Sequence, residues 1–586
     1  MPSRPRLRAL GVAAGIALIF LLATRQLGSD MYSTQPAYRN QVSAFLEGRL
    51  AMHPSPGALA HDLAWSPSGA GVQQVWGLGV PMWLTPFDLV ARLVGQGPFP
   101  ERVALWFWMT LTLFVLIRAF RREGEPWWIG GGGVLIVGLL PALVTMFRGR
   151  VGVYEEAAAY AYTAAAILLG GVVAFARNPT RNRYLILLLA AGLTGLIRPT
   201  VWFYGFATAA IATVIYLQHA GKKALPILAL GAVLFVAGGA TLYATNVARF
   251  GGGSEFGHSL NIEALHGNVY ATRFSYPFQR VGLVEAGVEL VGGLFGRPTG
   301  QHHVYYSSDL HVGQSATPRW REYYFTAYSW PYLPLLIAGL SLGVHAWRKR
   351  RDERWIAVWA VIGAAPLLWF YLRSPSLSSR YQLDLGPAFA ALLVVVWRYG
   401  AQWMLERKHR IVAPLLLVAL WSTAVLTGES RGKGALGRTD REGARRTAYR
   451  PGLMTAATPE PPAIYDIADP KLETYLDHDG RPPELYLNGT GWWRPSGSVA
   501  PTVTLYISDP KVLEVEVEPA DAQVQAKIDL VHLTLVETMP NEKGAKLRFA
   551  VPDGMTGLHV LFLAFGPDTW IARPKTEIVL RRVRTR

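Results

Sequence analysis

Apolar residues fall into long blocks separated by short basic turns, and the blocks stop near residue 427. Between Ala9 and Gly428 there are about eleven blocks of about 15 to 22 residues, the length that crosses a hydrocarbon core about 30 Å thick. A soluble fold would spread its apolar residues more evenly along the chain. The block pattern therefore predicts a polytopic α-helical membrane protein with about eleven transmembrane helices.

Composition narrows the chemistry and the partners. The chain has no cysteine, which excludes disulfides, thiolate metal sites and a cysteine nucleophile. Its net charge of +17 would suit a nucleic acid, but the basic residues cluster between apolar blocks, where membrane topology and anionic headgroups place them. We therefore expect no nucleic-acid partner. The sequence also lacks a P-loop, a dinucleotide fingerprint, a nucleophile elbow and a His-Glu-x-x-His motif.

The basic residues also predict the orientation. Arg4, Arg6 and Arg8 precede the first block, and placing them in the cytoplasm puts most of the later short basic turns inside as well. We expect the first block to remain as a helix rather than to be cleaved as a signal peptide, because Thr24-Arg25-Gln26 is a poor cleavage site. The predicted spans are residues 8–24, 103–119, 127–146, 157–175, 183–197, 200–217, 223–244, 328–346, 355–372, 385–398 and 411–427.

This arrangement of spans places two long loops, 25–102 and 246–327, and everything after residue 427 on the outer side. Loops longer than about 15 residues are usually functional or disordered, so the outer face is the predicted working face. One segment opposes this orientation, because seven basic residues lie between Arg431 and Arg450. If one of the predicted spans is not real, the C-terminal domain is cytoplasmic.

Two parts of loop 25–102 have the pattern of membrane-surface segments. Residues 79–95 are apolar but are interrupted by prolines and an aspartate, which predicts an interfacial or re-entrant segment. A helical stripe typical of a surface helix is formed by Tyr38, Val42, Phe45, Leu46 and Leu50.

Carboxylates lie at the predicted outer boundary of the membrane. Asp30 comes just after the first span, and Glu155 and Glu156 open the fourth. A single carboxylate at a bilayer boundary can simply be solvated, whereas ionisable groups at span ends that face a shared cavity are often functional. Two acidic sites at one depth favour the functional interpretation.

Arginines occupy the same predicted level, namely Arg148, Arg198 in a tight turn, and Arg380. Each could extend to lipid headgroups, but the planar guanidinium also suits a phosphate. Carboxylates and arginines together fit the transfer of a group from a lipid phosphate. A carboxylate would take the proton of an acceptor hydroxyl, and arginine or a divalent cation such as Mg²⁺ or Mn²⁺ would stabilise the departing phosphate.

Several segments of the membrane half follow one another in a recognisable order, beginning with the basic N-terminus, one span and Asp30. The later segments are 45–50, 61–65, 77–87, Tyr154-Glu155-Glu156, 191–200 with Ile197-Arg198-Pro199, and 379–387 with Ser379-Arg380-Tyr381. In this order they resemble the polyprenyl-phosphate-sugar glycosyltransferases of the GT-C fold, which include the aminoarabinose and protein mannosyl transferases.

This resemblance implies an inverting sugar transfer from an undecaprenyl-type phosphate sugar to a lipid, glycan or protein acceptor outside a bacterial inner membrane. Asp30 stands at the position of the family's base. The second acidic position is a Glu pair here, so the resemblance leaves open whether Glu155 or Glu156 matters. His61 and Asp62 have no certain counterpart; they could assist a metal or the acceptor, or cap a loop, which we favour.

Other functions fit parts of the pattern. A transporter or flippase of a lipid-linked glycan would carry charges near the membrane midplane, whereas the charges here lie at span ends. A non-catalytic envelope protein is a third alternative. In loop 246–327 His302, His303, Asp309 and His311 could suggest a metal site, but their spacing favours an acceptor-binding loop.

The sequence changes character after the last span. Residues 428–456 form a basic and then Pro-rich linker, and 457–586 are predicted to be an extracytoplasmic all-β sandwich. Trp492 and Trp493 could stack on a sugar, although packing inside the sandwich is the commoner role. The predicted strands are 484–488, 502–507, 512–517, 524–528, 532–536, 545–551, 558–565 and 576–583.

Overall fold

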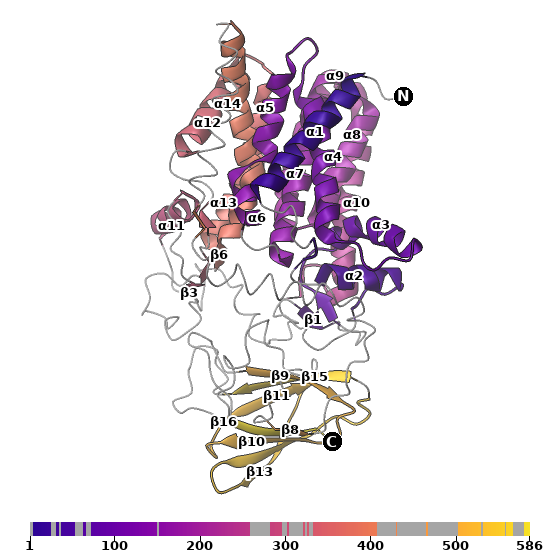
Figure 1. Cartoon of the computed structure of the whole chain (residues 1–586), viewed down its shortest axis with the longest axis vertical. Helices are drawn as coiled ribbons and strands as arrows, with labels where there is room; N and C mark the ends of the chain where they lie inside the picture. Colours follow the sequence, from indigo (N-terminus) through magenta and orange to yellow (C-terminus); the bar gives the residue numbers. More distant parts are fainter. Residues whose placement is uncertain are drawn as a thin grey trace.

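The structure is a computed structural model in which helices form one bundle and strands form the C-terminal part of the chain (Figure 1). The described residues are 4–24, 31–33, 37–52, 63–65, 72–148, 152–257, 282–295, 302–303, 320–322, 325–326, 332–374, 376–406, 429–430, 464–466, 502–528, 531–556, 558–565 and 579–585.

Helices occupy every predicted span except 411–427, which lies outside the described residues. Six of the described helices are long and apolar enough to cross a membrane, or seven if α5 and α6, which are bent by 46°, count as one broken span. This supports a multi-pass membrane protein. The bundle helices are α1 (Arg4–Ala23), α4 (Glu101–Phe120), α5 (Trp127–Gly138), α6 (Pro141–Arg148), α7 (Val153–Arg177), α8 (Arg181–Leu193), α9 (Trp202–Ala220), α10 (Leu225–Phe250), α12 (Tyr332–Arg348), α13 (Glu353–Arg373) and α14 (Gly386–Glu406).

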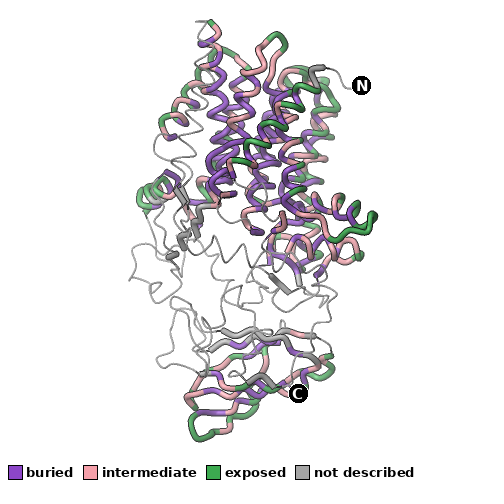
Figure 2. Tube along the Cα trace, in the orientation of Figure 1, coloured by how far each residue is buried: buried purple, intermediate pink, exposed green. Residues whose placement is uncertain are grey.

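Helix α7 is the centre of the bundle. Its most apolar 18 residues are 83% buried, a larger share than in any other candidate span among the described helices. Small residues explain this position, because the alanines at 157–159, 161 and 164–166 let neighbouring helices approach closely. The buried core seen in Figure 2 surrounds it.

Contacts at the two ends show that successive helices alternate in direction. One end, here called the Glu156 end, joins the last residues of α1 to α6 through Arg148 and also holds the start of α7. The opposite end, called the Arg398 end, joins α4, α13 and α14 through Arg398. The predicted outer boundary corresponds to the Glu156 end and the predicted basic turns to the Arg398 end.

Two short helices lie across the bundle at the Glu156 end, α2 (Ala37–Leu46) and α3 (Gly79–Leu93) (Figure 1). In α2 Tyr38 and Val42 of the predicted apolar stripe are buried in the bundle core, so this part of the stripe packs on the protein rather than on lipid. The other three stripe residues, Phe45, Leu46 and Leu50, are half-buried. Segment 79–95 is helical as an interfacial segment would be. Between the two helices, β1 (Leu63–Trp65) and β2 (Val72–Gln74) form an antiparallel pair.

Short elements complete this end. They are the 3-10 turns η1 (Thr194–Leu196), η2 (Pro199–Val201) and η6 (Ser379–Leu383), helix α11 (Leu283–Phe295), and the strands β3 (His302–His303), β4 (Trp320–Glu322), β5 (Phe325–Thr326), β6 (Ser376–Ser378) and β7 (Glu429–Ser430). A further 3-10 turn, η3 (Gly221–Ala224), joins α9 to α10. Strands β3, β4 and β6 form one sheet, and β5 pairs with β7.

The β5–β7 pair bears on which side the C-terminal domain lies. Strand β5 contacts α6 and α11 near the start of α12, so β7 belongs to the Glu156 end. Glu406, the last residue of α14, is at the Arg398 end, where nearby Gln402 contacts Arg351. The residues that flank predicted span 411–427 therefore lie at opposite ends of the bundle.

The C-terminal strands form two antiparallel sheets of order β13-β14-β10-β16-β8 and β12-β11-β15-β9. Buried residues of both sheets, such as Val515, Leu561 and Val583, belong to one apolar cluster. The strands are β8 (Ile464–Asp466), β9 (Thr502–Ser508), β10 (Leu513–Glu518), β11 (Val524–Ile528), β12 (Val531–His532), β13 (Leu535–Pro540), β14 (Ala545–Phe549), β15 (Leu558–Phe565) and β16 (Val579–Arg584).

Most predicted strands agree with these bounds, but one predicted strand divides, one observed strand was not predicted, and one prediction is not tested. Predicted strand 532–536 divides between β12 and β13, which belong to different sheets. Strand β8 was not predicted. Only residues 464–466 pair, and so short a segment shows no alternating pattern in the sequence. Predicted strand 484–488, together with Trp492 and Trp493, lies outside the described residues.

Candidate functional site

Two carboxylates are buried side by side at the Glu156 end. Glu101 opens α4 directly after Pro100, and Glu156 lies in the first turn of α7; each is 1% exposed. They are close enough to interact electrostatically. Glu101 is held by α2 and by the segment before it. Its Oε1 lies 3.0 Å from Arg39 Nε of α2, and its Oε2 accepts the backbone N–H of Ser33 at 3.3 Å.

Glu156 is bound very differently. Neither of its carboxylate oxygens has a hydrogen-bond partner of good geometry among the described residues, and the hydroxyl of Tyr160, one turn further along α7, also has none. Burying a carboxylate without hydrogen bonds costs on the order of 1 to 3 kcal/mol or more, unless a ligand or a proton compensates the charge. A buried carboxylate that lacks hydrogen bonds and lies next to a second buried carboxylate points to a functional role.

The structure separates the two members of the predicted Glu pair. Glu155 Oε2 accepts the backbone N–H of Gly152 at 3.0 Å, which caps the N-terminus of α7. Glu155 is therefore occupied in starting the helix. Glu156, one position later, points into the buried cluster with Glu101.

A second cluster surrounds Asp384, which follows η6. Arg198 Nη2 lies 3.1 Å from Asp384 Oδ2, and the Tyr371 hydroxyl donates a short hydrogen bond to the same oxygen. The Tyr204 hydroxyl donates to the Asp384 backbone carbonyl at 2.8 Å. Four elements, α9, α13, η6 and the turn before η2, are thus joined through one residue.

The charges of this ion pair support each other. Burial raises the pKa of the Asp384 carboxyl above its usual value, and the adjacent Arg198 offsets part of that rise. For Arg198 burial lowers the pKa, but Asp384 and the neighbouring tyrosines outweigh it, so that its pKa is raised. Arg198 therefore remains a cation whose charge is already matched by Asp384.

Tyr381 brings together two of the three predicted phosphate-binding arginines. Its ring centre lies 5.5 Å from the guanidinium carbon of Arg198 and 5.7 Å from that of Arg380. Tyr371 stacks on the Tyr381 ring at 5.2 Å. Arg380 also covers the ring of Tyr154 at 4.2 Å, directly before the Glu pair. The arginine cluster and the carboxylate cluster are therefore neighbours.

Close backbone packing places the other segments of the sequence pattern here. A Cβ at Gly77 would lie 2.0 Å from the Leu196 carbonyl oxygen, and one at Gly79 would meet Ile197, so only glycine lets segment 77–87 touch the Arg198 turn. Trp76 packs edge-on against Tyr154 at 5.4 Å. Segments 77–87, 154–156, 191–200 and 379–387 therefore converge.

Buried Arg249 holds this loop in place from α10. Its Nη1 donates to the backbone carbonyls of Gln74 at 3.4 Å and Trp76 at 2.8 Å. These bonds fix the strand β2 and the residues that lead into α3. The role is structural, because the guanidinium is used on main-chain oxygens.

The remaining predicted site residues are placed as follows. Arg148 donates from Nε to the Ala23 carbonyl at 2.8 Å, so it ties α6 to the end of α1. Asp30, His61 and Asp62 lie outside the described residues. His302 and His303 form strand β3, whereas Asp309 and His311 are also outside. Within the part of the chain that the structure describes, no group of three His, Asp or Glu residues could hold a metal.

Sequence reasoning missed several residues of the site. Glu101 follows a proline at the start of an apolar block, which is a signal for a boundary carboxylate like Glu156. Asp384 lies inside the segment 379–387 that carries the family resemblance. Tyr381 lies in the same segment, whereas Tyr371 has no such signal, because aromatic residues are common in every span.

A small cavity of about 10 Å³ adjoins Asp384 and is lined by residues that include Tyr162, Thr200 and Tyr204. Small-molecule sites usually measure about 300 to 1,000 Å³, so this cavity does not by itself enclose a sugar. Among its described residues, the site consists of charged side chains and of the aromatic residues that position them. No protein-family model matches the sequence, and a search of curated proteins finds no match either.

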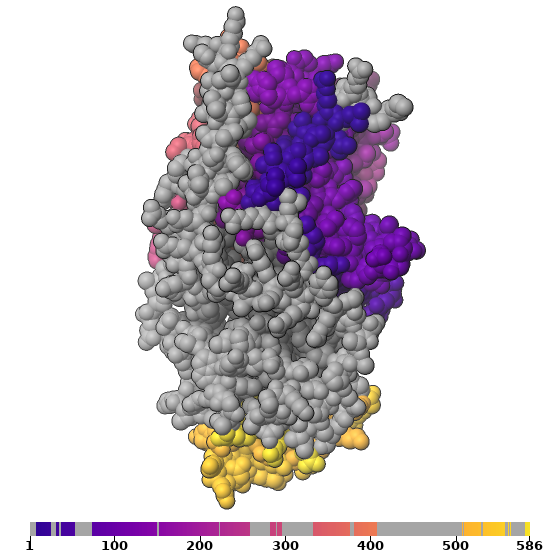
Figure 3. All heavy atoms as spheres, viewed as in Figure 1, coloured from indigo at the N-terminus to yellow at the C-terminus, as the bar shows by residue number. Residues whose placement is uncertain are grey.

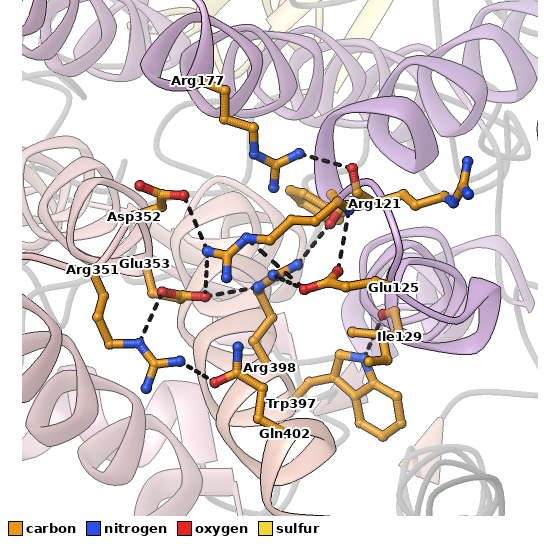
Figure 4. Close-up of polar contacts among 12 residues, drawn as sticks. Arg121, Glu125, Ile129, Arg177, Arg351, Asp352, Glu353, Trp397, Arg398 and Gln402 are labelled. Atoms are coloured by element: carbon orange, nitrogen blue, oxygen red, sulfur yellow. Dashed lines mark hydrogen bonds and ion pairs between the residues drawn. The ribbon is translucent and has the colours of Figure 1, made fainter. Parts of the chain in front are cut away.

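A further group of buried charges lies at the Arg398 end (Figure 4). Arg398 donates to Glu353 Oε1 at 2.9 Å, to Glu125 Oε1 at 3.1 Å and to the Phe120 carbonyl at 2.7 Å. Arg122 adds a bond to Glu353 at 3.0 Å, and Arg177 joins α7 by donating to the Arg121 carbonyl. The arginines named here bond carboxylate or carbonyl oxygens. This network therefore fixes the ends of the helices.

Proposed function

We propose that this protein is a GT-C-type membrane glycosyltransferase with about eleven spans, as the sequence blocks predict. It transfers a sugar from a polyprenyl-phosphate donor to a lipid, glycan or protein acceptor on the outer face of a bacterial inner membrane. The observation that carries the proposal is the convergence of buried Glu101 and Glu156 with Arg198 and Arg380 at one end of the bundle. The first span ends at the same end, just before Asp30.

The residues divide the reaction between them. Asp30 takes the proton of the acceptor hydroxyl while that oxygen attacks the anomeric carbon and the bond from this carbon to the phosphate oxygen breaks. Arg380 stabilises the negative charge that remains on the polyprenyl phosphate. Arg198, which is matched by Asp384, holds Tyr381 and thereby Arg380 in position.

Glu156 contributes a second carboxylate to the proposed site. Its carboxylate lies in the buried cluster and has no hydrogen-bond partner of good geometry among the residues described, so it is available to a substrate hydroxyl or to a cation. A divalent cation such as Mg²⁺ or Mn²⁺ would supply further charge stabilisation at the departing phosphate.

The pairing of β5 with β7 supports an outer C-terminal domain. Residue 429 shares the Glu156 end with the long loop that precedes α12, in spite of the seven basic residues that follow. In this proposal the two sheets form an extracytoplasmic β-sandwich, because their buried residues share one core. The N-terminus is cytoplasmic by the positive-inside rule.

The test is a transfer assay in membranes that contain the protein and a radiolabelled polyprenyl-phosphate sugar. Asp30→Asn and Glu156→Gln should each lower transfer at least about a hundred-fold, because a positioned acid or base contributes 10²–10⁴ in rate. Glu123→Gln is the matched control, since Glu123 is an exposed carboxylate near the opposite end. Full transfer by Asp30→Asn protein at normal levels would refute the assignment; movement of the lipid across the membrane without a new glycosidic bond would favour the flippase alternative.

A further inference from the structure

Helix α11 has two apolar faces, and only one of them packs on the protein. Ala286, Leu290 and Leu294 are buried against the bundle. On the other face Val284, Val288 and Val291 are 82, 69 and 40% exposed. Their spacing of four and three residues forms one continuous helical stripe. An exposed apolar stripe of this kind is typical of a surface that contacts an apolar partner or lipid.

The buried face of α11 is attached to the arginine-bearing turn η6. Gln382 donates from Nε2 to the Gly293 carbonyl at 3.1 Å, and Phe295 stacks on Phe389 at 6.2 Å. Gln382 lies between Tyr381 and Asp384 in the chain. Whatever fixes α11 therefore also fixes the height of Arg380 relative to the bundle.

Helix α3 repeats this design on the opposite flank of the bundle at the same level (Figures 1 and 2). Leu89, Val90, Leu93 and Val94 are exposed, and Leu93 reaches 77%. The other face is anchored, because buried Asp88 accepts the Phe99 N–H at 2.7 Å and Arg92 Nε at 2.9 Å. In the space-filling view α3 projects sideways from the bundle (Figure 3).

Both exposed faces continue the surface of candidate membrane spans. The Phe87 ring of α3 packs against Phe107, which is itself exposed in the first half of α4. Helix α11 contacts α13, whose last turns expose Trp369 and Phe370. Exposed aromatic residues at the end of a span mark the boundary between hydrocarbon and headgroups. The apolar faces of α3 and α11 therefore lie at that boundary.

We propose that α3 and α11 are interfacial helices whose exposed apolar faces contact the acyl chains of the lipid leaflet at the Glu156 end. Helix α11 thereby holds η6, and α3 holds the Arg198 turn, at the depth of the lipid phosphates. At that depth Arg380 would meet a phosphate attached to a membrane-anchored chain. The contact with lipid depends on the membrane assignment and not on the transferase reaction. It can therefore fail or hold separately from the proposed function.

Site-directed fluorescence tests the contact, since the chain has no cysteine of its own. Val288→Cys and Leu93→Cys protein, each labelled with bimane, is reconstituted in phosphatidylcholine–phosphatidylglycerol bilayers that contain doxyl-labelled lipids. Both labels should be quenched by the lipid-borne doxyl group at a depth of about 5 to 10 Å below the headgroups. Iodide in the water should quench them weakly. Glu542→Cys, an exposed position between β13 and β14, is the control and should respond to iodide alone.

Two results would overturn the proposal. Strong iodide quenching and no lipid quenching at Val288→Cys would place α11 in water. Cross-linking of the same cysteine between two copies by a bifunctional maleimide, without lipid quenching, would show that a second chain covers the stripe. Both substituted side chains are exposed, so neither change disturbs a packed core.

Discussion

The two ends of the helix bundle bury the same kinds of side chain and use them in opposite ways. At the Arg398 end Glu353 contacts Arg398 at 2.9 Å and Arg122 at 3.0 Å, so its charge is matched. At the Glu156 end the carboxylate of Glu156 is just as buried but has no hydrogen-bond partner of good geometry within the described part of the chain. The first arrangement fixes helices, and the second leaves a buried carboxylate without such bonds.

The difference extends to what each end holds. The Arg398 network joins α4, α5, α7, α13 and α14 through side-chain and carbonyl contacts. The Glu156 end instead gathers turns and loops, such as η6 and the Arg198 turn, which aromatic rings position around the arginines. A rigid end and an end built from loops on that scaffold are the usual division between framework and functional site.

The largest expected effect comes from breaking the Arg398 network. Glu353→Gln should lower the free energy of unfolding by on the order of 3 to 5 kcal/mol, because it removes one partner of a buried ion network and leaves Arg398 and Arg122 without it. The shift is measured as a lower thermal unfolding midpoint of the purified protein in detergent.

The control for Glu353→Gln is its neighbour. Asp352→Asn removes a carboxylate that also contacts Arg122, at 3.1 Å, but whose side chain is half exposed, so it should cost no more than about 1 kcal/mol. Equal effects of the two substitutions would show that the Arg398 end is not held by its buried charges.

An intermediate effect is expected where the loop meets the Arg198 turn. Gly77→Ala should cost roughly 1 to 3 kcal/mol, because its Cβ would lie 2.0 Å from the Leu196 carbonyl oxygen and the backbone must move. The same shift displaces Arg198, so transfer activity should fall with stability.

Gly15→Ala is the matched substitution for Gly77→Ala. A Cβ at Gly15 meets nothing within 4 Å in the interior of α1, so this change should stabilise the protein by about 0.5 to 1 kcal/mol. If Gly77→Ala behaved like Gly15→Ala, the close packing of the loop on the Arg198 turn would be wrong.

The sequence predicted the framework better than the site, for physical reasons. Apolar blocks of a given length allow little except a membrane helix, so the positions of α4, α7 and α13 follow from hydropathy alone. Strand positions such as 524–528 and 558–565 also follow from alternating residues between turn signals.

The interior of the site could not be predicted in this way. The pairing of Arg198 with Asp384 joins residues 186 positions apart, which no local pattern encodes. The direction in which Glu155 and Glu156 point depends on the cap at Gly152, so the sequence left both as candidates. The stripe of α2 was apolar as predicted, but only its packing under Trp76 shows that Tyr38 faces protein rather than lipid.

The smallest expected effects separate the two members of the Glu pair. Glu155→Ala removes the cap of α7 and should cost about 0.5 to 2 kcal/mol. Glu156→Gln should leave the free energy of unfolding unchanged or raise it by up to about 1 kcal/mol. A neutral amide is less costly to bury than a carboxylate that lacks hydrogen bonds. Thermal unfolding of both variants measures this contrast. A loss at Glu156→Gln as large as that of Glu353→Gln would mean that Glu156 is held as firmly as the carboxylates of the Arg398 end, and the contrast between the two ends would then be lost.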